Sequence, residues 1–121
     1  MKKISKIYLV TFIVLLNNVV AIAQEKELKY EKGDVSYDMF YQNFEQNAAF
    51  VYIKTEHKDL NITSNIKGIK KELPTFSFDN NRIFAIETEK QKFIIKKNGY
   101  KALIIVIPKL IASQRLEIVI K

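Results

Sequence analysis

Short runs of alternating apolar and polar residues, separated by turn residues, are the feature that most constrains the fold of this chain. From Ala48 onward, runs rich in β-branched and aromatic side chains recur at intervals of about ten residues. Asp79-Asn80-Asn81 and Lys97-Asn98-Gly99 predict turns between them. No long helical pattern separates the runs, which disfavours parallel β-α-β units. We therefore expect an all-β chain.

The expected architecture is a small antiparallel β-sandwich of Ig-like or prealbumin-like type. One predicted strand, residues 102–107, is apolar on both faces: Leu103, Ile105 and Ile107 share one face, and Ile104 and Val106 share the other. Such a strand is either central or covered by a neighbouring segment. We also expect the last run, residues 116–120, to pair within a sheet. The predicted strands occupy residues 48–55, 60–63, 82–87, 91–96, 102–107 and 116–121.

The region before Ala48 is less regular. Residues 24–34 are charged and end in Gly33-Asp34, so we interpret them as a flexible lead-in or a first edge segment. Residues 35–47 hold four aromatic side chains whose spacing fits one helical face, and an aromatic strand followed by a turn is the alternative. We expect these aromatics to cover the core. The segment around Phe40 is then a candidate cover for Ile104 and Val106.

The N-terminus has the features of a secretory signal. Lys2, Lys3 and Lys6 precede an apolar run that starts at Ile7, and the small residues Ala21 and Ala23 follow it. Such an order predicts cleavage after Ala23. A retained anchor is the alternative, although the stretch is shorter than the roughly 20 residues that span a bilayer. The predicted organisation is a signal peptide (1–23), a partly ordered lead-in (24–47) and a β-sandwich domain (48–121).

Composition and charge exclude several classes of function. The chain has no Cys, which rules out disulfides, thiol catalysis and zinc–thiolate sites. The formal net charge is +7, but basic side chains exceed acidic ones by only four once residues 1–23 are removed. This modest excess, together with export, argues against a nucleic-acid partner. We expect no stable membrane span after cleavage.

The sequence contains no recognisable catalytic or metal-binding motif. His57, in the polar break Glu56-His57-Lys58-Asp59, is the single histidine, and no Gly-x-Ser-x-Gly turn occurs. A metal site made of Glu56, His57 and Asp59 has no recognised ligand spacing. We therefore expect His57 to be a surface-loop residue. The chain is expected to be neither an enzyme nor dependent on a metal or cofactor.

Two lysine clusters are candidate binding surfaces. One contains Lys67, Lys70 and Lys71, and the other surrounds the turn at Asn98-Gly99. Either can meet an anionic partner, or simply be solvated and protect a sheet edge from aggregation. Gly99 is expected to supply a positive φ at its turn. The candidate surface patch consists of Lys96, Lys97, Tyr100 and Lys101.

Five segments between Ala48 and Lys121 follow the strand and turn pattern of a known kind of module: Ala48–Thr55, Leu60–Asn65 with Gly68, Arg82–Ile86, Phe93–Tyr100 with its Lys-Asn-Gly-Tyr ending, and Leu116–Ile120. In these segments the chain resembles the PEGA-type and carboxypeptidase regulatory-like β-sandwich modules of exported proteins of Gram-negative bacteria. The resemblance implies a non-catalytic module for binding or assembly in the periplasm or cell envelope. Its partner is then another envelope protein or an anionic envelope polymer.

Overall fold

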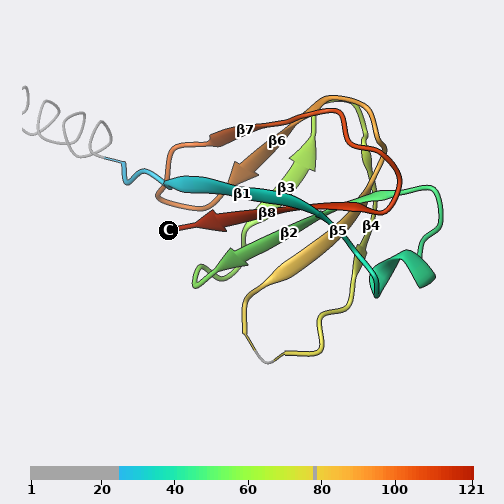
Figure 1. Cartoon of the computed structure of the whole chain (residues 1–121). Coiled ribbons are helices and arrows are strands. Elements are labelled where there is room, and N and C mark those ends of the chain that lie inside the picture. The colour runs from blue at the N-terminus through green and yellow to red at the C-terminus, as the bar shows by residue number, and fades with distance from the viewer. Residues whose placement is uncertain (1–24, 78) are drawn as a thin grey trace, which may run out of the picture.

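The computed structural model describes residues 25–77 and 79–121, and the predicted signal peptide lies outside them. These residues form two packed β-sheets, as Figure 1 shows, which confirms the expected small β-sandwich. One sheet has five strands in the order β1-β8-β2-β5-β4, and the other has three in the order β3-β6-β7. The strands are β1 (Tyr30–Tyr37), β2 (Ala49–Thr55), β3 (Asn61–Ser64), β4 (Ile69–Leu73), β5 (Arg82–Ile86), β6 (Gln91–Lys96), β7 (Leu103–Ile107) and β8 (Gln114–Ile120).

Most strand pairs are antiparallel, but β2 and β8 run parallel, with Val51 opposite Leu116 and Ile53 opposite Ile118. Parallel neighbours need a long connection between them. Here the connection is most of the domain, because β3 to β7 lie between these two strands in the sequence. The last strand is therefore internal, between β1 and β2, which confirms that it pairs within a sheet.

The main core lies between the two sheets and follows from the period-two alternation of the strands. Inward-facing residues of β2, β5 and β8 pack against those of β6 and β7. Phe84 and Phe93 meet across the core in an edge-to-face contact, with ring centroids 6.0 Å apart. Leu103, Ile105 and Ile107 point into this core, as predicted, and Ile105 is completely buried.

A second, smaller core covers the outer face of the five-stranded sheet. Phe50, Ile83 and Ala85 lie on this face, beneath Tyr41. The aromatic segment forms the 3-10 helix η1 (Tyr41–Asn43) rather than a longer helix. The buried carboxylate of Asp38 holds this turn by accepting hydrogen bonds from the backbone N–H groups of Phe40 and Tyr41. The Tyr41 hydroxyl donates to the carbonyl of Pro74 over 2.9 Å.

Two expectations need correction in this region. The first correction concerns the lead-in, part of which forms β1 and pairs with β8. The lead-in is therefore a first edge segment and not a flexible one. The sandwich thus includes residues before Ala48. The segment around Phe40 covers the five-stranded sheet and leaves Ile104 and Val106 exposed. The expectation that β7 is central or covered was wrong, since β7 lies at the edge of the three-stranded sheet. Apolar residues on both faces do not distinguish a central strand from an edge strand.

Candidate functional site

The candidate site lies at one end of the sandwich, and we call it the basic end. It is formed by the loop after β2 (residues 56–60), the β6–β7 connection (residues 97–102), the loop before β5 and the end of β8. Residues distant in sequence meet here because the antiparallel pairing of β3 with β6 places Asn61 opposite Lys96. The loop that precedes β3 therefore lies beside the loop that follows β6.

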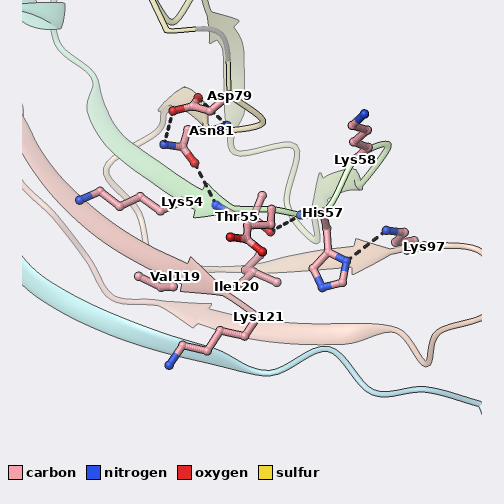
Figure 2. Close-up of a pocket in the computed structure, with 11 residues that line it drawn as sticks. Lys54, Thr55, His57, Lys58, Asp79, Asn81, Lys97, Val119, Ile120 and Lys121 are labelled. Atoms are coloured by element: carbon pink, nitrogen blue, oxygen red, sulfur yellow. Dashed lines mark hydrogen bonds between the residues drawn. The ribbon is translucent and has the colours of Figure 1, made fainter.

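Hydrogen bonds to the backbone hold the loop after β2 in place. The side-chain oxygen of Asn81 accepts from the Thr55 N–H (3.0 Å), and the Asn80 amide donates to the Glu56 carbonyl (3.0 Å). The Thr55 hydroxyl oxygen accepts from the His57 N–H at 3.0 Å. These bonds fix the loop against the segment before β5, so the side chain of His57 projects from a supported backbone (Figure 2).

His57 faces Lys97 across the basic end. The Lys97 ammonium nitrogen lies 3.1 Å from His57 Nδ1, as the dashed line in Figure 2 marks. Because an ammonium group can only donate, Nδ1 accepts this hydrogen bond. The imidazole thus positions the lysine.

Tyr100 completes the same cluster. Its ring packs edge-on against His57, with centroids 5.4 Å apart. The ammonium groups of Lys97 and Lys26 lie 5.3 Å and 5.8 Å from the ring centroid. Both distances are within the range of cation–π attraction. Two lysines are therefore held around one aromatic ring in spite of their like charge.

A cavity of about 930 Å³ opens beside this cluster. Val119 and Ile120 at the end of β8 contribute to its lining, together with four lysines. A second cavity of about 610 Å³ shares Lys97 and is lined by Lys96 and Tyr100 as well. The first cavity is lined by Lys54, Thr55, Glu56, His57, Lys58, Asp79, Asn81, Lys97, Val119, Ile120 and Lys121.

The charges around the larger cavity are not balanced by its two carboxylates. Asp79 accepts hydrogen bonds from Ser77 and Asn81, which stabilise its turn. Within residues 25–77 and 79–121, neither Lys58 nor Lys97 has a carboxylate within 4.0 Å. The basic end thus keeps positive charge that can bind an anion.

The other two cavity lysines form ion pairs on the outside of the molecule. Lys54 lies 3.5 Å from Glu117, and Lys121 lies 3.2 Å from Glu31. Glu117 also accepts a hydrogen bond from Arg115 at 2.7 Å. Chiefly this hydrogen bond, with a contribution from the charge of Lys54, holds the pKa of Glu117 below its ordinary value. Glu117 therefore remains charged beside Lys54 in neutral and mildly acidic solution.

The predicted patch is only partly assembled by the structure. Lys96, Lys97 and Tyr100 border the smaller cavity, whereas Lys101 pairs with Glu27 at 3.2 Å. Gly99 has φ +81°, which confirms the predicted positive φ.

His57 and Lys58 join this patch only in the folded chain. Only the β3–β6 register brings their loop to the patch, and no spacing within the sequence contains that information.

No metal site accompanies the basic end in the part of the chain that the structure describes: no three His, Asp or Glu side chains gather there as ligands would. Among the same residues, no helix has the length and apolar character needed to cross a bilayer. Comparisons with protein-family models, with curated proteins and with solved structures find no match to this chain.

Proposed function

We propose that this chain is an exported, non-catalytic β-sandwich module of the bacterial cell envelope that binds an anionic envelope polymer through the basic end. The observation that carries the proposal is that Lys58 and Lys97 line a large cavity and, in the described part of the chain, have no carboxylate within 4.0 Å. The signal-like N-terminus and the resemblance to modules of exported proteins support the cellular location.

The geometry favours a chain-like anion over a small one. Two cavities share Lys97, so positive charge extends from Lys58 and the larger cavity to Lys96 and the smaller one. A polymer with repeated phosphate or carboxylate groups can contact several lysines at once, and weak contacts then add up. The partly exposed Val119 can accept the carbon skeleton between those groups.

A binding experiment tests this function. The mature chain, residues 24–121, is titrated with polyphosphate and with polyglutamate, which separate the two kinds of anion. The double variant Lys58→Gln/Lys97→Gln should bind roughly 2- to 30-fold more weakly, since an exposed ion pair contributes about 0.2–1 kcal/mol. The matched control Lys70→Gln/Lys90→Gln removes the same charge outside both cavities. Equal losses in the two double variants would show that only net charge matters.

Export is tested separately. When the full chain is expressed in a Gram-negative bacterium, we expect the intact mass of the periplasmic protein to correspond to an N-terminus at Gln24. The small side chains of Ala21 and Ala23 fit the specificity of signal peptidase. A chain that starts at Met1 and stays in the membrane fraction would instead support the alternative, an accessory envelope protein retained by an uncleaved anchor.

A further inference from the structure

The exposed edge of β7 differs from the other edges of the two sheets. Sheet edges are commonly protected by charges, bulges or short polar strands, because their free backbone groups can pair with another chain. The edge strand β1 carries charges and an irregular register between Lys32 and Val35, and β4 has the sequence IKKEL. The third edge, β3, is the short polar sequence NITS. In contrast, β7 reads LIIVI and contains no charged or polar side chain.

The outer face of β7 is also apolar and open to solvent. Ile104 is 56 % exposed and Val106 is 38 % exposed, whereas their neighbour Ile105 is fully buried. The β6–β7 register places Ile94 directly beside Ile104. Among the described residues, no strand other than β6 pairs with β7, and only the bridge between Lys26 and Tyr100 lies near the free edge. An incoming strand would thus find both free backbone groups and a small apolar surface.

Lysines surround this apolar surface. Lys92 lies opposite Val106 in the register, and Lys96 shares the outer face of β6 with Lys92 and Ile94. Lys101 and Lys109 flank β7 in the sequence. Lys101 pairs with Glu27, but for Lys92, Lys96 and Lys109 the described part of the chain offers no carboxylate within 4.0 Å.

This charge distribution selects between two occupants of the edge. The backbone N–H of Lys101 already donates to the Lys26 carbonyl, so the free edge begins beyond residue 101. If β7 paired antiparallel with a second copy, Lys92 and Lys109 of both copies would gather at one interface, where like charges repel. A strand that carries acidic residues would be attracted by the same lysines, which is the complementarity expected at a specific interface.

We propose that β7 is a docking edge for an extended acidic segment of another protein, which adds to the three-stranded sheet as a fourth strand. Backbone hydrogen bonds to β7 supply affinity, and apolar residues on alternate positions cover Ile104 and Val106. Acidic residues that flank these apolar positions lie beside Lys92 and Lys109. Neither lysine lines the two cavities of the basic end, so the edge can bind its partner whether or not the basic end binds a polymer.

The probe is a peptide of alternating valine and threonine that is flanked by glutamates at both ends. With the mature chain labelled for NMR, we expect its addition to shift the amide signals of β7, and the affinity to fall as salt is added. The variants Ile104→Lys and Val106→Lys should each weaken binding by about tenfold or more. Their thermal midpoints verify that they remain folded. Thr63→Lys, which adds the same charge at exposed β3, is the matched control and should bind normally.

Several results would overturn the proposal. Equal binding of a peptide flanked by lysines instead of glutamates, or of the glutamate-flanked peptide with proline at alternate positions, would exclude acidic strand addition. Shifts confined to the loops around His57 would assign the peptide to the basic end. A concentration-dependent dimer of the free chain that Ile104→Lys abolishes would show that β7 pairs with a second copy. The proposed polymer site is measured with Lys58→Gln/Lys97→Gln, so its failure is distinguishable from failure at β7.

Discussion

Deletion of residues 116–121 is expected to leave the chain unfolded or aggregated. The deletion removes Leu116, Ile118 and Ile120, each at most 2 % exposed, from the main core. At about 1.5–3 kcal/mol for each fully buried aliphatic side chain, the loss approaches the roughly 5–15 kcal/mol that stabilises a typical domain. It also leaves β1 and β2 without the strand between them.

Circular dichroism and size-exclusion chromatography of the truncated mature chain measure this effect. Removal of Lys121 alone is the control, because its side chain is exposed and the buried residues of β8 remain. We expect the control to be folded and monodisperse. A truncated chain that is soluble and melts at the original temperature would contradict the internal position of β8.

Two neighbouring isoleucines give the second large prediction. Ile105 is 0 % exposed and Ile104 is 56 % exposed, although they adjoin each other in β7. Ile105→Ala should lower the free energy of unfolding by about 2–5 kcal/mol, since it removes buried methyl groups and leaves a cavity. Ile104→Ala should change it by about 0.5 kcal/mol or less, as most exposed substitutions do.

Denaturant titration of both variants provides the measurement. The comparison is controlled internally, because strand, residue type and substitution are the same and only the face of the sheet differs. Similar losses at the two positions would mean that β7 is covered on both faces, and the apolar surface beside the proposed docking edge would then be occupied within the monomer.

Only those parts of the candidate site that depend on adjacent residues could be predicted from the sequence. The turn at Gly99 was predictable because a tight turn with positive φ requires particular residues at adjacent positions. The grouping of His57 with Lys97 was not, because these residues are joined only through the pairing of β3 with β6. Likewise, the four aromatics of residues 35–47 indicated a cover for a core, but not which sheet they cover.

The sequence by itself determined that this chain is a β-sandwich and located most of its strands, because alternation and turn chemistry are local and directly visible. It also determined which side chains of β7 share a face, since successive residues point to opposite sides of a strand. Only the tertiary structure decided the order of the strands, the parallel pairing of β2 with β8 and the edge position of β7. Alternation assigns each residue to a face but does not specify the neighbouring strand. The basic end and the open apolar edge depend on those neighbours and therefore appear only in the folded chain.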